Sequence, residues 1–462
     1  MSLLNINILR LMQEQSHALN TQLKKLETSD FPSKDNHTFI KEAISLNKLF
    51  FSFFNSDDPS QISQQDIQVM SYLFRYFLMN IYPRIEHSTD SHHPLEVMIP
   101  VKEIIEKITP GANVITSPEY AINYSIGEIW QCLARPINSL NKFPTINENK
   151  TIMLTFPKLH KNNVLFGCIM GHEIGHYIDL HCGFDLSSIL YKQLCQFINI
   201  QSIRPYVVNG QQLTDQEIQL SLPDMLRPVY YNWVKEYVAD ILGIILYGPA
   251  SHFSSEQIFM LYGVEQGAEI LKDSIAQSHP RRIARSRIKR RTMEKLNFTS
   301  YLSSDVIQLM DSWHHGWENA QGMTFTYETN SFKFNHAILI ELEELFLSNL
   351  DQIIDAIISF CSVKSIPMYT STEFNQITGR LVAKIEGLIP PNELDGNPVS
   401  SISILNAGWI SYFQSLQVIC DETKNQDKNA AQDILNNLIR KALYSGHIHR
   451  RWIDAATNTT TN

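Results

Sequence analysis

The chain has 462 residues, of which 44% are hydrophobic and 18% are charged, and its formal net charge at pH 7 is −9. The length is sufficient for two or three domains, and the composition is that of a globular protein. The acidic balance argues against a general nucleic-acid binder, and the longest apolar runs are far shorter than the roughly 20 residues of a membrane span. We therefore expect no nucleic-acid partner and no integral membrane segment.

The amino terminus and the cysteines favour a reducing compartment inside the cell. Residues 1–7 lack the basic stretch and the apolar core of a signal peptide. The 6 cysteines form no Cys-x-x-Cys pair, and several lie in apolar helical contexts, which favours reduced thiols. We expect a cytoplasmic protein, with delivery into another cell left open.

The first part of the chain reads as helical. Apolar residues recur at helical spacing in the segments 3–27, 38–54, 61–85 and 95–108, and Pro110-Gly111 closes the last of these.

Strand patterns follow at Asn113–Thr116, Tyr120–Ser125 and Thr151–Phe156, of which the third is the strongest. An edge strand there could pair with an extended peptide substrate. An internal strand with no role in binding is the alternative.

The segment that carries chemistry is His172-Glu173-x-x-His176. On a helix, the two histidines lie one turn apart on the same face and can reach one metal ion, while Glu173 can take a proton from a metal-bound water. The apolar residues around the motif, a polar start at Lys161–Asn163 and a stop at Gly183 predict a mostly buried helix over 163–182. Buried histidines and a buried glutamate need partners, which a zinc ion supplies.

A second apolar helix is expected from Pro228 to Tyr247, after an irregular polar stretch over 201–224. Glu236 and Asp240 lie four residues apart and therefore on one helix face. A catalytic zinc commonly has three protein ligands, so Glu236 is the predicted third ligand. Asp240 is predicted to accept a hydrogen bond from a ligand histidine and to fix its tautomer.

Other arrangements of these acids are possible. Glu236 and Asp240 could form an ordinary salt bridge, for example with Lys235. Asp179 and His181 are rival third ligands. Asp179 lies on the same helix as His176, where the geometry is awkward, and His181 faces elsewhere.

The motif order adds a resemblance. His172-Glu173-x-x-His176 and Glu236-x-x-x-Asp240 are followed by His279-Pro280 and then by Arg285. This pattern resembles gluzincin metallopeptidases, in particular the HtpX and CaaX-prenyl-protease family, over roughly residues 110–295. The resemblance implies that Glu173 is the general base, that Glu236 is the third ligand and that His279 lies near the substrate oxyanion. The chain lacks the transmembrane helices of the integral-membrane members, so we expect a protein or peptide substrate rather than a prenylated one.

Residues 281–291 form a basic run whose apolar positions fit a helix. Nucleic-acid binding is one interpretation. In an acidic protein, a solvated helix face with one arginine buried against carboxylates is favoured. Arg285, like Asp240, is expected to lie next to the metal ligands.

Together these patterns predict a mainly α protein with a small β-sheet (α+β). We expect a helical N-terminal region at 1–110, a zincin-like metallopeptidase core at 111–295 and a helical C-terminal region at 296–462 that recruits a substrate or partner.

The predicted function is zinc-dependent hydrolysis of peptide bonds. Zn²⁺ held by His172, His176 and Glu236 would lower the pKa of its bound water. Glu173 would accept the proton as hydroxide attacks the scissile carbonyl, and His279 would stabilise the oxyanion. The alternative is a helical interaction protein with a structural or inactive zinc site.

Overall fold

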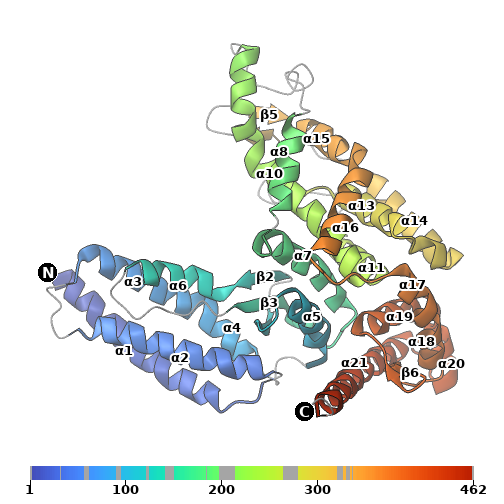
Figure 1. The fold of residues 1–462 in the computed structure, drawn as a ribbon, viewed down its shortest axis with the longest axis horizontal. Coiled ribbons are helices and arrows are strands. Elements are labelled where there is room, and N and C mark those ends of the chain that lie inside the picture. Colours follow the sequence, from blue (N-terminus) through green and yellow to red (C-terminus); the bar gives the residue numbers. More distant parts are fainter. Residues whose placement is uncertain are drawn as a thin grey trace. The chain divides into compact units, whose positions relative to one another are not determined.

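A computed structural model describes residues 3–31, 33–56, 62–89, 95–120, 124–140, 150–183, 185–196, 214–263, 279–319, 326–328, 333–335 and 337–459. These residues belong to two compact units, Met1–Asn163 and Val164–Asn462 (Figure 1). Helices dominate both units, and the sheets have two or three strands, which confirms the predicted mainly α fold with a small β component. The three-part division drawn from the sequence remains a prediction.

Helices build most of the first unit. They are α1 (Leu3–Glu27), α2 (Lys34–Phe54), α3 (Gln64–Tyr76), the π-helical η2 (Phe77–Ile81), α4 (Tyr82–His87), α5 (Leu95–Ile108), α6 (Ile129–Ser139) and the 3-10 turn η3 (Lys158–His160). The single helix predicted over 61–85 is therefore divided. The π-helical segment precedes Pro83, which has no backbone N–H to donate to a carbonyl in the preceding turn.

The sheet of the first unit has the order β1-β3-β2, with β1 at Asn113–Glu119, β2 at Ser125–Glu128 and β3 at Thr151–Pro157. The central strand β3 pairs in parallel with β1 and antiparallel with β2, and all of its residues are buried. The strongest predicted strand is thus an internal one, and the edge-strand alternative is wrong. A strand paired on both sides has no free backbone donors or acceptors for a peptide.

The second unit is a larger helical assembly. Its helices are α7 (Met170–His181), α8 (Leu186–Gln196), α10 (Asp215–Tyr247), α11 (Pro249–Gly263), α13 (Arg282–Lys295), α14 (Ser304–Asn319), α15 (Ala337–Ser348), α16 (Leu350–Val363), α17 (Ser371–Glu373), α18 (Gly379–Glu386), α19 (Ser401–Gln414), α20 (Leu416–Thr423) and α21 (Lys428–Thr459). Short segments are η4 (Phe166–Ile169), η6 (Thr299–Tyr301), η7 (Phe374–Thr378) and the strand pairs β4–β5 (Thr326–Glu328, Lys333–Asn335) and β6–β7 (Glu393–Leu394, Asn397–Pro398).

Two helices of this unit begin at other residues than the sequence predicted. The helix predicted over 163–182 is α-helical only from Met170, because its first turn is the 3-10 segment η4, and it ends before Gly183, whose φ is +73°. The stretch over 201–224 was expected to be irregular, but α10 already begins at Asp215 and continues through Pro223 and Pro228. A proline removes one backbone donor from a helix and crowds one carbonyl, which can bend a helix without ending it. Residues 197–213 lie outside the described residues.

Helices α7 and α10 approach each other very closely (Figure 1). A Cβ added to Gly171 would lie 2.7 Å from the ring of Tyr247, and one added to Gly243 would lie 3.2 Å from the backbone nitrogen of His172. Only glycine fits at such contacts between helix backbones. This packing brings the face of α7 that carries the two histidines onto the C-terminal half of α10.

The C-terminal helices attach to this core through polar contacts. Asn406 on α19 donates a hydrogen bond to the Tyr247 carbonyl at 2.9 Å and accepts one from the Ala250 N–H at 3.0 Å, so it satisfies backbone groups at the α10–α11 turn. Within the described ranges, no single helix is long and apolar enough to cross a membrane. Ile340–Ser348 and Leu350–Val363 meet that test only together, as a pair bent by 61°.

Candidate metal centre

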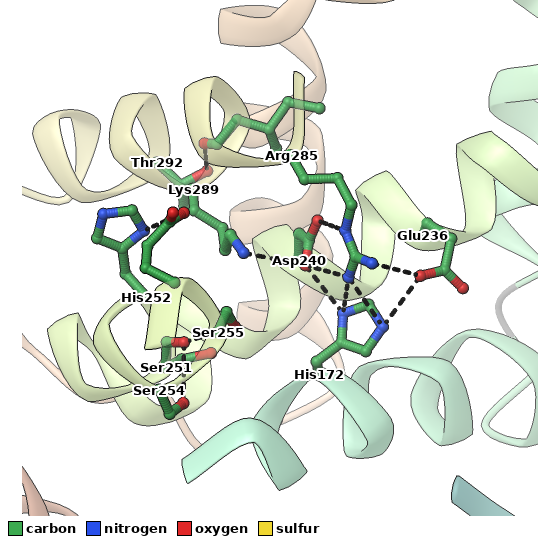
Figure 2. Close-up of polar contacts among 12 residues, drawn as sticks. His172, Glu236, Asp240, Ser251, His252, Ser254, Ser255, Arg285, Lys289 and Thr292 are labelled. Atoms are coloured by element: carbon green, nitrogen blue, oxygen red, sulfur yellow. Dashed lines mark hydrogen bonds and ion pairs between the residues drawn. The ribbon is translucent and has the colours of Figure 1, made fainter. Parts of the chain in front are cut away.

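Three helices of the second unit bring the predicted site residues together. Helix α7 supplies His172 and His176, α10 supplies Glu236 and Asp240, and Arg285 reaches them from α13. Figure 2 shows the Arg285 side chain extending from its helix to the carboxylates of α10, with the His172 ring facing it from below. The site lies wholly within the second unit.

The distances among the candidate ligands suit a small cation. The Nε2 atom of His172 is 3.3 Å from Glu236 Oε2, and the Nε2 atom of His176 is 3.2 Å from Glu236 Oε1. Donors bound about 2.1 Å from a tetrahedral zinc are roughly 3.4 Å apart. The three residues offer ligand atoms that all lie within 4.8 Å of one another, and no other such group of His, Cys, Asp or Glu occurs in the described part of the chain.

A polar atom without a hydrogen bond also supports this fit. Glu236 Oε2 is buried and accepts no hydrogen bond, although the Arg285 Nη1 atom lies 3.1 Å away. Arg285 balances the charge of this carboxylate but makes no hydrogen bond to Oε2, and a bound metal ion would satisfy that acceptor directly. The nitrogen and oxygen donors fit a divalent ion of the zinc type, and they would leave positions open for water and substrate.

Asp240 orients the first histidine. Its Oδ1 lies 3.0 Å from His172 Nδ1, which directs the Nδ1–H toward the carboxylate. The Arg285 Nη2 atom lies 3.3 Å from His172 Nε2, so a metal bound at Nε2 would replace this contact. Arg285 in turn donates from Nε to Asp240 Oδ2 at 2.7 Å and from Nη2 to Oδ1 at 2.9 Å. Burial alone would raise the pKa of Asp240, but Arg285 and Lys289 outweigh it and hold the pKa well below its ordinary value. Asp240 is therefore a fixed anion.

Burial and neighbouring charges shift the pKa values of both His172 and Glu173. Burial and Arg285 lower the pKa of His172, yet Asp240 and Glu236 outweigh them and raise it to about 9. Without a metal, a proton on this imidazole can supply the compensating positive charge, so metal binding would displace that proton. Burial raises the pKa of the Glu173 carboxyl, against the opposing charges of His172 and His176. A raised pKa suits a group that accepts a proton near neutral pH.

His279 lies at the edge of the cluster. Its Nε2 is 4.0 Å from Glu236 Oε2, and its side chain is 51% exposed. Burial lowers the pKa of His279, against the attraction of Glu236. The imidazole is close enough to the ligands to meet a bound substrate, and it remains accessible from solvent.

The rival ligands have other roles. A carboxylate oxygen of Asp179 accepts a hydrogen bond from the Ser187 N–H at 3.0 Å, at the start of α8. His181 stacks on Tyr177 with ring centroids 5.1 Å apart. Neither residue belongs to the group of three candidate ligands.

Sequence reasoning missed a buried polar layer behind Asp240. Lys289 was expected on a solvated helix face, but its side chain is fully buried, with Nζ 3.9 Å from Asp240 Oδ1 and 4.3 Å from the Phe259 ring centroid. Further back, His252 and Glu256 are also buried, and Glu256 accepts a hydrogen bond from the Trp317 indole at 2.7 Å. Lys289 follows Arg285 by four residues, so the spacing that grouped Glu236 with Asp240 could have placed it on the same face.

The geometry defines a candidate metal centre of two histidines and one glutamate, with a second glutamate beside the first histidine. Comparison with known proteins gives one further indication. The chain is 32% identical over 135 residues to a Bacillus subtilis (strain 168) protein described as "Uncharacterized metalloprotease YhfN". The match covers 28% of this chain and 29% of that relative, less than a third of either. No family model matches the chain, and no solved structure does. Part of the chain is thus similar to a metalloprotease.

Proposed function

We propose that the chain is a zinc-dependent endopeptidase of the gluzincin type that cleaves a protein or peptide substrate. The observation that carries the proposal is the group formed by His172, His176 and Glu236, with Glu173 next to it in the sequence. The partial similarity to a metalloprotease supports the same reaction class. Zinc is proposed over other divalent ions because two imidazoles and one carboxylate are a common catalytic zinc set.

In this proposal His172, His176 and Glu236 hold the ion. When bound, the ion supplies Lewis acidity, which makes water more acidic and polarises the substrate carbonyl. Asp240 keeps the Nδ1–H of His172 directed away from the ion, and Arg285 keeps Asp240 ionised and oriented. The chain therefore supplies a preorganised set of ligands that need little rearrangement on binding.

Glu173 moves the proton. Its carboxylate takes a proton from the attacking water as the water oxygen bonds to the scissile carbonyl carbon. The same proton then passes to the amine nitrogen as the carbon–nitrogen bond breaks, so Glu173 ends the cycle ionised. Its position directly after His172 on α7 supports this role.

His279 is proposed to donate a hydrogen bond to the developing oxyanion. Its Nε2 lies 4.0 Å from Glu236 Oε2 and its side chain is half exposed, so a substrate carbonyl could reach it from solvent. One donor aimed at such an oxygen contributes about a hundredfold or more to the rate.

The deciding experiment is a search for substrates with wild-type protein and Glu173→Gln. The variant keeps the size of the side chain and all three metal ligands, but it loses the proton acceptor. We expect new protein amino termini in a proteome treated with the zinc-loaded wild type and at least about a hundredfold fewer with the variant. Equal cleavage by both proteins would reject Glu173 as the base. Full zinc binding without cleavage by the wild type would instead indicate a structural metal site.

A further inference from the structure

A buried carboxylate on α15 ties together two segments that flank the candidate centre. Glu343 is fully buried, and its Oε1 accepts hydrogen bonds from Arg281, from Nε at 3.1 Å and also from Nη2. Its Oε2 accepts a hydrogen bond from the Tyr237 hydroxyl at 3.2 Å. One side chain thus joins α10, the start of α13 and α15.

Both partners of Glu343 are close in sequence to residues of the site. Tyr237 directly follows Glu236, and Arg281 comes two residues after His279. Pro280 lies between His279 and Arg281 and is buried, and its ring fixes one of the backbone torsions that separate them. Holding Arg281 therefore restricts where the His279 backbone can lie relative to α10.

His279 needs such support. Its side chain is half exposed, so burial alone does not fix its orientation. A hydrogen-bond donor placed about 1 Å from its productive position loses much of its effect on a rate. The planar guanidinium of Arg281 donates two hydrogen bonds to the Glu343 carboxylate, which fixes the orientation of the Arg281 side chain as well as its distance.

We propose that Glu343 is a positioning residue that sets His279 against Glu236 through Arg281 and Tyr237. The inference rests on the proposed function, in which His279 contacts the substrate oxyanion. It gives the C-terminal part of the chain a role in the reaction, because α15 supplies the anchor for a segment that precedes α13.

The chain contains a matched control for this contact. Arg291 lies on α13, ten positions after Arg281. It donates hydrogen bonds to Asp351 on α16 from Nε and from Nη2, each at 2.7 Å. The two side chains are 45% and 48% exposed. This pair has the same chemistry and also joins α13 to a C-terminal helix, but it lies on the surface and beyond reach of His279. Asp351→Asn therefore tests loss of such a pair without loss of the anchor.

Glu343→Gln is the informative substitution. It keeps the size of the side chain and its acceptor oxygen, and the Arg281 side chain is 22% exposed, so the released charge can be solvated. Removing Arg281 instead would leave a buried carboxylate without its cation, which threatens folding. Arg281→Lys is a second variant that keeps the charge and loses the fork.

Kinetics on the zinc-loaded protein test the coupling. We expect His279→Ala to lower kcat about a hundredfold and Glu343→Gln to lower kcat about tenfold at nearly unchanged KM. In the His279→Ala background, Glu343→Gln and Arg281→Lys should each lower kcat by less than about twofold, because a residue that acts through His279 then has nothing to position. Asp351→Asn should match the wild type.

Two results would overturn the proposal. One is an equal loss from Glu343→Gln with and without His279, which would indicate general loosening of the fold. The other is loss of bound zinc in Glu343→Gln, which would show that the effect passes through Glu236.

Hydrogen exchange provides a readout that does not need activity. The backbone amides of His279, Arg281 and Arg282 should exchange faster in Glu343→Gln than in the wild type or in Asp351→Asn. If the wild type cleaves no protein, the proposed function fails, and these exchange rates still decide whether Glu343 anchors the segment. Unchanged exchange would reject the anchor itself.

Discussion

Gly175 lies directly against the backbone of Ala239 on the facing helix. A Cβ at position 175 would be 2.9 Å from both the Cα and the carbonyl oxygen of Ala239, and 3.1 Å from the Cβ of Leu242. Gly175 precedes His176, and Ala239 precedes Asp240. The separation of α7 and α10, and with it the spacing of the metal ligands, therefore depends on a hydrogen atom at this position.

Gly175→Ala should disturb both stability and metal binding. Alanine favours an isolated helix by about 1 kcal/mol, but forcing a methyl group into a backbone contact typically costs about 1–3 kcal/mol. The clash cannot be relieved by a rotamer change, so the helices must separate and carry His176 away from Glu236. We expect a lower thermal unfolding midpoint and zinc affinity about tenfold weaker in competition with a chelator. Gly167→Ala is the control, because a Cβ there meets no atom within 4 Å. Wild-type zinc affinity in Gly175→Ala would show that the helix spacing is not critical.

The ligand histidines should be individually necessary. Purified wild type should bind about one zinc per chain, since three convergent donors hold the ion tightly. His172→Ala and His176→Ala each leave two protein ligands and should lose the metal, as measured by elemental analysis after dialysis. His181→Ala is the matched control on the same helix, since His181 packs on Tyr177 away from the cluster. Full zinc in both ligand variants would rule out this centre.

Glu236, Asp240 and Asp179 should differ in their effect on zinc. Glu236→Ala removes a ligand and should release the metal. Asp240→Asn keeps the shape beside Arg285 but weakens the orientation of His172, so affinity should fall by roughly ten- to a hundredfold. Asp179→Ala should retain zinc, since the Asp179 carboxylate caps α8. Chelator competition across the three variants gives the order. Release of zinc by Asp179→Ala, together with its retention by Glu236→Ala, would move the third ligand onto α7.

His252 should make the folded state sensitive to mild acid. Burial lowers the pKa of His252 well below its ordinary value, and Lys289 and Arg290 act in the same direction. The titratable groups that face it from α10, α11, α13 and α14 are Asp240, Glu256, Lys289, Arg290 and His314. The unfolded chain takes up a proton near pH 6.5, whereas the native imidazole stays neutral. Stability from this residue is therefore present above pH 6.5 and is lost as the pH falls below it.

His252→Phe removes that dependence while keeping an aromatic ring against Trp313. Between pH 6.5 and 5.5, the wild type should lose up to about 1.4 kcal/mol of unfolding free energy that the variant retains. Glu256, whose pKa burial raises, acts with the opposite sign. Because its Oε1 lies 3.6 Å from His252 Nδ1, the comparison is repeated in a Glu256→Gln background. The measurement is the thermal unfolding midpoint of each protein across this range. Parallel pH profiles would mean that His252 is already protonated in the native state.

Features that depend on residues close together in the sequence were predicted well. Local periodicity predicted the helices, and the spacing from His172 to His176 needed only one helical turn to bring both imidazoles to one point. Glu236 was found because two acids shared a face of an apolar segment. The structure brings all three together, as expected for elements whose faces are set by local pattern.

What the sequence did not reveal depends on tertiary packing. Lys289 belongs to the basic run at 281–291 and Glu343 to an apolar segment with several acids, and their burial becomes visible only when α13 and α15 meet α10. The early start of α10 was missed because Pro223 and Pro228 carry a strong local signal against a helix, which the rest of the helix overrides. Long-range neighbours leave no mark on a single sequence.

The pairing of Arg285 with Asp240 also affects when the centre can form during synthesis of the chain. Arg285 is made 45 residues after Asp240. A ribosome releases the chain from its amino terminus, so α7 and α10 emerge before Arg285 and Lys289, while His172 is already present beside Asp240. Burying that carboxylate without Arg285 is unfavourable, so α7 and α10 should close less stably around it. A nascent chain that ends before α13 would therefore lack a finished centre, and the proposed peptide-bond cleavage would begin only after synthesis has passed this point.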